Sequence, residues 1–443
     1  SWELRSHSLS MTAPLHAPLV SYPKAWSPGT GGMITAEAVW FHPSTDSALE
    51  SYRDRLGGRI VLFGEPDRVE PRFEPYATRM ADEALLDLAN AGPPAGPLPR
   101  EGPGEEIRRR AALLEYRSWR LMEEEGALAV LTSGGRDGGN ISVGAAHTAQ
   151  HPDTPLARRV KPFERRAMRM LPQAAVAAEH YGRLCRMMER GARVTLRMNL
   201  EVESRPADSA WNVIAEIPGG DLKEEIVMIG AHLDSWHGGT GATDNGTGVA
   251  ACMEALRILR MLPSRPRRTI RIALWTGEEQ GLFGSRSYVR RHLARQEAGD
   301  SGAVLLHSRE AKRFSVYFNH DNGTGRIRGV YLQGNEAVRP IFRAWLEPFG
   351  DMGASTLSLA ATTGSDHVAF DLAGLPAFDF IQDDIEYGTR TWHSTMDLSE
   401  RVIEEDLKQS AVVLASFAWH AAMRDGLIPR TVRPAAVLEE WTR

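Results

Sequence analysis

The chain has 443 residues, of which 42% are hydrophobic and 25% are charged, and its formal net charge is −5. These proportions are typical of folded globular proteins and exclude a collagen-like, coiled-coil or wholly disordered chain. The small acidic balance argues against a dedicated nucleic-acid-binding protein, which needs a strong basic excess to displace counterions from phosphates. The length accommodates about three average domains, or one large α/β domain with an insertion.

Cysteine is scarce, with Cys185 and Cys252 the only two in the sequence. Two cysteines cannot build a disulfide framework, a thiolate zinc site or an iron–sulfur cluster, so any metal must be held by His, Asp and Glu. The longest apolar stretch, 411–422, is shorter than the ~20 residues needed to cross a bilayer, and we expect a buried helix there. Because the chain begins at Ser1 without a signal-peptide pattern, we expect a processed or truncated product.

The first half of the chain indicates a small α/β region. Residues 1–35 are rich in Ser, Pro and Gly and show no sustained hydrophobic period, so we expect extended chain there. Periodicity then predicts strands over 36–41 and 59–63, helices over 113–122 and 174–190, and a short apolar run over 127–131 between the helices.

From about residue 204 onwards, strands and helices alternate. The predicted strands cover 212–217, 226–229, 269–275, 314–318 and 376–381, and helices are predicted over 246–262 and 285–294. Such alternation predicts a sheet with helices on both faces, in which functional groups collect at the carboxyl ends of the strands.

Metal-capable side chains follow the predicted strands over 226–229 and 269–275. Residues two apart in an extended segment point the same way, so His232 and Asp234 can share a side, and the carboxylate can fix the imidazole tautomer for metal binding. Asp244 opens the next helix, where its alternative role is a simple N-cap. The adjacent Glu278 and Glu279 follow the strand over 269–275 between glycines, so one can bind a metal while its neighbour faces the activated water.

Further candidates follow the later strands. Asp321 comes after the strand over 314–318, and His393 lies in a polar loop after the strand over 376–381. One crevice at the strand ends can collect the whole set. Two histidines and three carboxylates besides Glu278 suit two metal ions about 3.5–4 Å apart with one bridging carboxylate. Imidazole and carboxylate ligands fit zinc, with cobalt or manganese as alternatives.

This ordered series, a His-x-Asp, an Asp-Asn-Gly, a Glu-Glu pair, an Asn-x-Asp and a final His, resembles the dizinc exopeptidase family of leucyl aminopeptidases and glutamate carboxypeptidases. The resemblance implies the zinc exopeptidase fold, an α/β architecture with a mixed central sheet flanked by helices and a smaller inserted α/β domain. It implies that residues 36–205 form this protease-associated insertion and 206–443 the dizinc peptidase domain. Residues 1–35 would also belong to the peptidase domain, which would be truncated at its amino end.

The resemblance also implies residue roles. Glu278 would be the general base, and Asp234 would orient the first histidine. The ligands implied for one zinc are His232, Asp244 and Asp321. Those implied for the other are Asp244, Glu279 and His393. The activity implied is hydrolysis of the peptide bond of dipeptides or of N-terminal residues by a water that two zinc ions activate.

Two positions depart from the family pattern. Trp392 stands where some relatives have a tyrosine that stabilises the oxyanion, and the nearby Tyr387 is an alternative donor. His320, next to the Asn-x-Asp aspartate, could compete with it as a ligand. The family-like Gly-Ser-Asp motif makes Ser365 and Asp366 candidates for substrate binding, together with Tyr387.

Other functions on the same fold stay open. A non-catalytic receptor-like protein and a glutaminyl-cyclase-like transferase are the alternatives, although every ligand type is present in order. Within peptidases, the sequence does not decide between aminopeptidase, dipeptidase and glutamate carboxypeptidase. From the family we expect a peptide substrate, no nucleic acid, no membrane span, a secreted or periplasmic location, and a homodimer.

Overall fold

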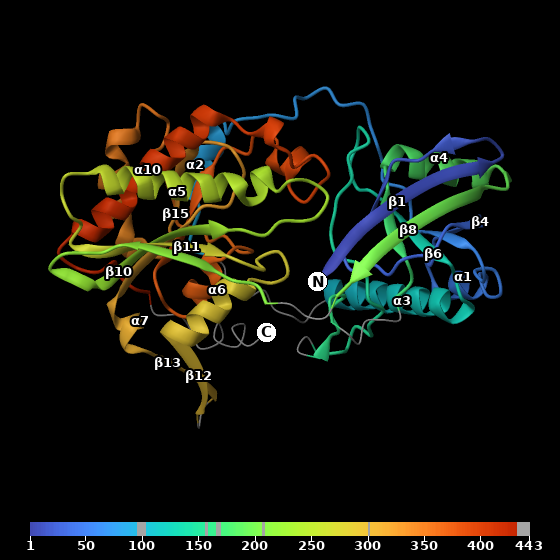
Figure 1. Cartoon of the computed structure of the whole chain (residues 1–443), viewed down its shortest axis with the longest axis horizontal. Helices are drawn as coiled ribbons and strands as arrows, with labels where there is room; N and C mark the ends of the chain where they lie inside the picture. The colour runs from blue at the N-terminus through green and yellow to red at the C-terminus, as the bar shows by residue number, and fades with distance from the viewer. Residues whose placement is uncertain (95–102, 156–157, 165–169, 206–208, 300–301, 432–443) are drawn as a thin grey trace.

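A computed structural model describes residues 1–94, 103–155, 158–164, 170–205, 209–299 and 302–431. Two β-sheets with their helices form two lobes that lie side by side (Figure 1). We call them the N-lobe, built from residues 1–205, and the C-lobe, built from residues 209–431. The predicted boundary near residue 205 adjoins residues 206–208, which lie outside the described residues.

The N-lobe sheet has eight strands in the order β2-β1-β8-β4-β5-β6-β7-β3. Its central strands β4 to β7 run parallel, and antiparallel partners flank them on either side. The strands are β1 (Trp2–Ala13), β2 (Ala17–Pro18), β3 (Ser21–Pro23), β4 (Ile34–Phe41), β5 (Ile60–Phe63), β6 (Ala129–Ser133), β7 (Gln173–Val176) and β8 (Thr195–Ser204). The helices of this part of the chain are α1 (Asp46–Glu50), α2 (Asp82–Asn90), α3 (Pro103–Glu125) and α4 (Ala178–Glu189).

The short apolar strand β5 is buried on both faces, as expected for a strand inside a parallel sheet. Ile60 and Leu62 share a core with Tyr181 of α4, whereas Val61 shares another core with Trp119 of α3. The two helices therefore cover opposite faces of the N-lobe sheet.

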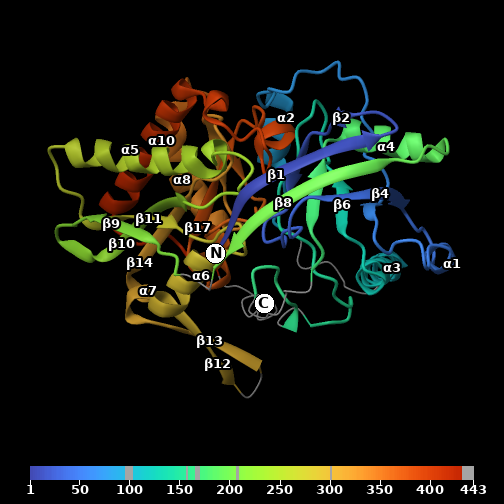
Figure 2. The same cartoon turned by 45° about the vertical axis from the view of Figure 1, so that its right-hand side comes forward.

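The position of β1 differs from the expectation that residues 1–35 belong to the peptidase domain. β1 pairs antiparallel with β8 along its length, from Trp2 opposite Ser204 to Ala13 opposite Thr195 (Figure 2). The segment is extended, as predicted, but it lies in the N-lobe sheet and not with the peptidase-like sheet. The pairing satisfies its main-chain hydrogen-bonding groups, and alternate side chains of the strand reach the N-lobe core.

The C-lobe sheet is mixed and has seven strands in the order β16-β15-β17-β14-β10-β11-β9. The four inner strands β17, β14, β10 and β11 are parallel, while β9 and β15 run antiparallel to their neighbours. The strands are β9 (Val213–Ile217), β10 (Leu222–His232), β11 (Arg268–Trp275), β14 (Phe314–Asn319), β15 (Ile327–Tyr331), β16 (Thr356–Ser358) and β17 (Ala377–Gln382). A separate hairpin joins β12 (Ala294–Gly299) and β13 (Gly302–His307).

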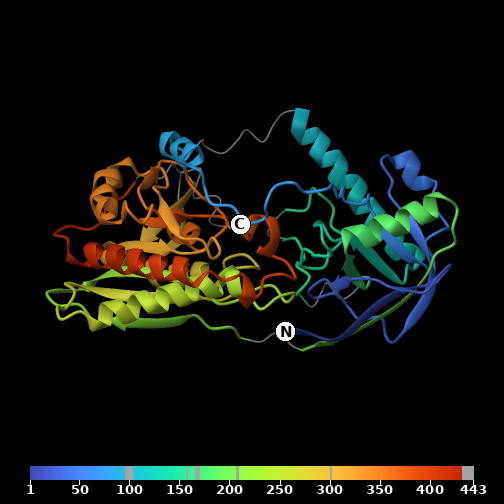
Figure 3. The same ribbon diagram turned by 90° about the horizontal axis from the view of Figure 1, so that it is seen from above.

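Helices cover both faces of this sheet, which confirms the predicted mixed α/β architecture. The α-helices are α5 (Thr247–Met261), α6 (Phe283–Tyr288), α7 (Arg309–Arg313), α8 (Arg339–Leu346), α9 (His367–Leu372) and α10 (Glu404–Met423). Val227 and Ile229 of β10 share a core with α5, α8 and α10, and the alternate residues Ile226 and Met228 share a core with α6, α7 and α9. Figure 3 shows α5 and α10 lying along one another on one side of the lobe.

The predicted buried helix over 411–422 is the C-terminal part of α10, and its packed face confirms that expectation. Across the described ranges, no helix is both long and apolar enough to cross a bilayer.

One segment of the N-lobe chain crosses to the C-lobe. After β5 the chain runs over the C-lobe, where α2 packs beside β16, and it then returns as α3 (Figure 3). We call residues 64–90 the strap. Arg79 of the strap forms ion pairs with the buried Asp383 and Asp406 of the C-lobe, at 2.8 and 2.7 Å. The strap thereby joins the lobes through buried charge.

Candidate metal centre

The predicted ligands lie at the carboxyl edge of the parallel strands of the C-lobe, where the sheet rule places functional groups. His232 ends β10, and Asp244 lies in the irregular turn that leads into α5. Glu279 follows β11, Asp321 follows β14, and His393 lies in the long loop between β17 and α10. Strands that neighbour each other in the sheet thus bring distant residues into one place.

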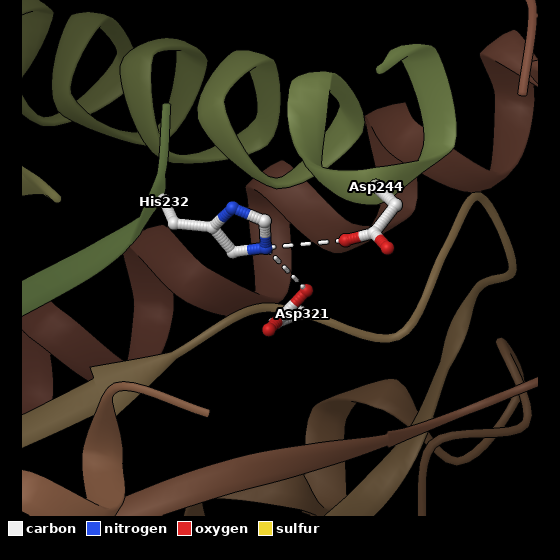
Figure 4. A group of neighbouring side chains, drawn as sticks. All are labelled: His232, Asp244 and Asp321. Atoms are coloured by element: carbon white, nitrogen blue, oxygen red, sulfur yellow. Dashed lines mark hydrogen bonds and ion pairs between the residues drawn. The ribbon is translucent and has the colours of Figure 1, made fainter. Parts of the chain in front are cut away.

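His232, Asp244 and Asp321 form one group whose ligand atoms lie within 4.8 Å of one another (Figure 4). The imidazole Nε2 lies 3.1 Å from Asp244 Oδ1 and 3.2 Å from Asp321 Oδ1. All three side chains are largely buried, with exposed fractions of 8% or less. Burial disfavours the imidazolium, but the Asp321 and Asp244 carboxylates outweigh it and hold the pKa of His232 well above its ordinary value.

A second group contains Asp244, Glu279 and His393. His393 Nε2 lies 2.8 Å from Glu279 Oε2 and 3.3 Å from Asp244 Oδ2. Asp244 therefore offers one oxygen to each group, as a bridging carboxylate would. Burial is the main reason that the pKa of His393 is lowered, which favours the neutral, ligating form of its ring.

The donor set fits divalent cations. Asp244 Oδ2 and Glu279 Oε1 are buried and lack a hydrogen-bond partner in the part of the chain that the structure describes. Burial, followed by the Asp244 charge, raises the pKa of Glu279 to about 9. Buried carboxylates that repel one another need a compensating positive charge. Imidazole and carboxylate donors without thiolate are those of many zinc sites.

The orientation of His232 differs in detail from the prediction. Its Nδ1 is hydrogen-bonded to the main-chain oxygen of Asp234 at 2.8 Å, while the Asp234 carboxylate lies 3.9 Å away. That carboxylate accepts hydrogen bonds from the main-chain N–H groups of Glu278 and Glu279, at 3.0 and 3.2 Å. Asp234 therefore orients the histidine through its backbone and the glutamate pair through its side chain.

Glu278 lies beside the ligands but belongs to neither group. It is 8% exposed, and burial together with the Asp321 charge raises its pKa to about 10. A bound cation nearby acts in the opposite direction, because positive charge favours the carboxylate. The carboxyl group therefore lies at the edge of the candidate centre, with a proton affinity that depends on the charges around it.

Ser365 and Asp366, expected to bind substrate, are instead buried beneath the ligands. The Ser365 hydroxyl donates to Asp321 Oδ2 at 2.5 Å and accepts from Asn319 Nδ2 at 2.8 Å. Asp366 is fully buried, and burial raises its pKa to about 7. The turn before α9 tucks both residues against β14, so Ser365 orients a ligand-type carboxylate and neither residue is accessible to a substrate in this structure.

The residues that depart from the family pattern take distinct positions. Tyr387 packs against Gly323, and burial and the Asp244 carboxylate hold the pKa of its hydroxyl well above the ordinary value. Trp392 is 45% exposed and stacks on His393 with ring centroids 4.1 Å apart. His320 points away from the ligand groups into the core, where burial lowers its pKa to about 4. It does not compete with its neighbour.

Sequence reasoning missed the role of Asp397. Its buried carboxylate accepts hydrogen bonds from the main-chain N–H of Thr243 at 2.6 Å and of Asp244 at 3.2 Å. It therefore ties the loop that carries His393 to the bridging aspartate. Asp397 lies four residues after that histidine, but the spacing carries no signal for a contact with residues 154 positions away.

The C-lobe fold and the two ligand-type groups have the arrangement that the motifs predicted for a zinc exopeptidase. The family model described as "Peptidase family M28" matches residues 212–418. This region, which contains every predicted ligand, is similar to peptidase family M28. The resemblance to dizinc exopeptidases inferred from the motifs is thereby confirmed.

Curated relatives carry two kinds of exopeptidase name. Carboxypeptidase Q of Mus musculus is 28% identical over 261 residues, which cover 59% of this chain and 52% of that protein. Aminopeptidase YwaD of Bacillus subtilis is 31% identical over 240 residues, which cover 53% and 49%. The chain spans about half the length of these relatives.

Solved structures show the same fold. A peptidase M28 precursor from Shewanella amazonensis superposes with a TM-score of 0.66 at 24% identity, covering 98% of this chain and 84% of that one. A zinc aminopeptidase from Bacillus subtilis gives a TM-score of 0.53 at 20% identity, covering 96% and 85%. At these identities the likeness concerns the fold of the chain, including the N-lobe.

Proposed function

We propose that the protein is an exopeptidase that uses two zinc ions to hydrolyse the peptide bond of dipeptides or of N-terminal residues. The observation that carries the proposal is the pair of ligand groups that share Asp244, with the carboxyl of Glu278 beside them and outside both. His232 and Asp321 would complete one site, and Glu279 and His393 the other. Cobalt or manganese would suit the same donors.

Bound zinc ions would supply Lewis acidity, which polarises the scissile carbonyl and makes water more acidic. Glu278 would take the proton of the attacking water as the new C–O bond forms. The same carboxyl would then deliver that proton to the amine nitrogen as the C–N bond breaks. Its burial keeps bulk water from intercepting the proton, and the Asp234 carboxylate holds its backbone in place.

Tyr387 is the proposed oxyanion donor. Its hydroxyl is a hydrogen-bond donor within reach of Asp244, at the shared corner of the two ligand groups. An O–H held at this place can stabilise the negative oxygen that develops on the substrate carbonyl. Trp392, at the position of the tyrosine in some relatives, is half exposed and has its ring occupied by stacking on His393.

The class of exopeptidase is set by which substrate terminus is recognised, and the relatives' names include both an aminopeptidase and a carboxypeptidase. Hydrolysis of a free dipeptide, its N-acetylated form and its C-amidated form by the zinc-loaded protein tests the proposal. If only acetylation abolishes hydrolysis, the protein is an aminopeptidase, and if only amidation does so, it is a carboxypeptidase. If each modification abolishes hydrolysis, it is a dipeptidase. No hydrolysis of any of the three would contradict the proposed function.

A glutaminyl-cyclase-like transferase and a non-catalytic receptor-like protein share this fold class. The presence of a second complete ligand group favours the two-zinc enzyme over both. Zinc content measured per chain separates them, because one ion per chain would favour the cyclase and none the receptor.

The remaining expectations concern the molecule as a whole. We propose that the N-lobe is the protease-associated domain predicted over 36–205, enlarged here by β1 to β3, and that the C-lobe is the peptidase domain predicted over 206–443. From the family we also propose a secreted or periplasmic location. We further propose a homodimer, and sedimentation of the purified protein would test this oligomeric state.

A further inference from the structure

The loop that carries His393 is enclosed by the N-lobe. We define the His393 loop as residues 385–397 and the clamp as residues 134–143, which follow β6 of the N-lobe. These segments lie about 250 positions apart in sequence, yet they meet in an isolated antiparallel β-bridge. Val143 N–H donates to His393 O at 2.8 Å, and Thr395 N–H donates to Ile141 O at 3.0 Å. Ser142 and Ser394 lie opposite each other between these bonds in antiparallel register.

Side chains of the clamp hold the loop on both sides of the histidine. Asn140 is 3% exposed; its amide donates to Arg390 O at 2.8 Å and accepts from the Thr395 hydroxyl at 3.1 Å. Arg136 donates to Trp392 O at 2.7 Å and to Gly388 O at 3.2 Å. The loop's carbonyl groups therefore find their partners in the other lobe.

The strap holds the start of the same loop. Thr78 and Ile385 exchange two main-chain hydrogen bonds of 2.9 Å. The Thr389 hydroxyl donates to Tyr76 O at 2.9 Å, and the Arg390 guanidinium lies over the Tyr76 ring, 4.1 Å from its centroid. Clamp and strap together fix the His393 loop from two directions.

This support meets a conformational need at the histidine. His393 has φ = +50°, a left-handed conformation that is uncommon for residues other than glycine. Such a conformation costs free energy and persists where the surroundings determine it, which is frequent at ligand-binding positions. The main-chain bond from Val143 to His393 O acts directly on this residue.

The other ligand group is held within the C-lobe. His232 is bound by the main chain of Asp234, and Asp321 by Ser365. The hydrogen bonds described above between the clamp and the His393 loop do not involve His232 or Asp321. Loosening the clamp should therefore disturb one ligand group and spare the other.

We propose that the N-lobe clamp positions His393 and thereby sets the affinity of the metal site formed by Asp244, Glu279 and His393. This inference rests on the proposed two-zinc function. In it the N-lobe is a part of the metal centre, and Asn140 and Arg136 are positioning residues. Their role is to hold one ligand and not to contact substrate.

Zinc binding to purified protein, titrated against a chromogenic chelator, tests the proposal without relying on turnover. The variants are Asn140→Ala and Arg136→Met, the second of which keeps the length of the side chain at a partly exposed position. The matched control is Asn199→Ala, because Asn199 donates to Ser6 within the N-lobe sheet. Near-ultraviolet circular dichroism and cooperative thermal unfolding check that each variant is folded.

We expect two ions per chain in the wild type and in Asn199→Ala. In Asn140→Ala and Arg136→Met, one ion should bind as in the wild type and the other about 10–100-fold more weakly, as when an outer partner of a ligand is lost. Excess zinc should restore kcat in both variants. Two ions bound with wild-type affinity in folded Asn140→Ala, or equal weakening of both ions, would overturn the role of the clamp. Fewer than two ions in the wild type would instead refute the proposed function itself.

Discussion

At the residue scale, the adjacent glutamates take different positions in the candidate metal centre. Glu279 points an oxygen to within 2.8 Å of His393 Nε2, whereas Glu278 belongs to neither ligand group. Both backbones are anchored on the Asp234 carboxylate, so the two side chains diverge from one fixed turn. In the proposed mechanism, Glu279 holds a cation and Glu278 carries a proton.

Replacing Glu278 by Gln should therefore abolish turnover without emptying the metal sites. The amide keeps the size of the side chain but cannot accept the proton, so we expect kcat to fall about 10²–10⁴-fold. Zinc content should stay at the wild-type value. Glu254→Gln, an exposed change on α5 that removes a pair with Arg257, is the control. A Glu278→Gln enzyme with wild-type kcat would show that another group moves the proton.

Tyr387→Phe removes one hydroxyl and leaves the ring packed against Gly323. Loss of one oxyanion donor costs about 10²–10³-fold in kcat in other hydrolases, and we expect a decrease of that size with little change in KM. Steady-state kinetics with a dipeptide measure both constants. An equal loss in Trp392→Phe with none in Tyr387→Phe would place the donor at the other position.

Continuous apolar runs made most of the C-lobe elements predictable. β10, β11, β14 and β17 are buried on both faces, so their composition is distinctive, and the strand-end rule then pointed to the five candidate ligand residues that the structure brings into two groups. The elements that were not foreseen depend on distant partners. β1 becomes a strand through its ladder with β8, almost 200 positions away, and the clamp is visible only once the lobes are assembled. Local pattern holds no information about such pairings.

The strap contains Arg79, whose ion pairs with Asp383 and Asp406 connect the lobes. Arg79→Gln would leave the buried Asp383 and Asp406 with Arg328 and Arg326 as their remaining cations. Breaking a buried pair costs about 3–5 kcal/mol, but Arg79 is 41% exposed and other arginines remain, so we expect a loss of about 1–3 kcal/mol in unfolding free energy. Denaturant unfolding measures it.

Arg257→Gln breaks an exposed ion pair on α5 and should change the unfolding free energy by less than about 1 kcal/mol. If Arg79→Gln were as mild as this control, the ion pairs of the strap would not contribute to joining the lobes.

For the whole molecule, the buried carboxyl groups of the candidate metal centre make the stability of the fold depend on pH and on bound metal. The pKa values of Glu278 and Glu279, about 10 and about 9, lie above those of unfolded glutamate because of burial and neighbouring charges. A carboxyl that binds its proton more tightly in the folded chain stabilises the fold at low pH. That stability is lost as pH rises from about 4.5 towards the folded pKa.

Removal of metal by a chelator should therefore lower the Tm, and the decrease should be larger at pH 8.5 than at pH 6. In the zinc-loaded protein the cations balance the carboxylates, so the same pH change should have a smaller effect. Thermal unfolding of both forms across this range measures the difference. A metal-free protein that gains stability as pH rises would contradict the assignment of these carboxyls as mutually repelling groups.

The ladder between β1 and β8 brings the two ends of the N-lobe together. Ser1 and Arg205 exchange main-chain hydrogen bonds, with Arg205 N–H donating to Ser1 O at 2.9 Å. Because these two residues are held together, residues 1–205 form a closed circuit of chain whose first and last strands move as one unit. Because the clamp lies within that circuit, its proposed effect on one metal site would depend on this closure.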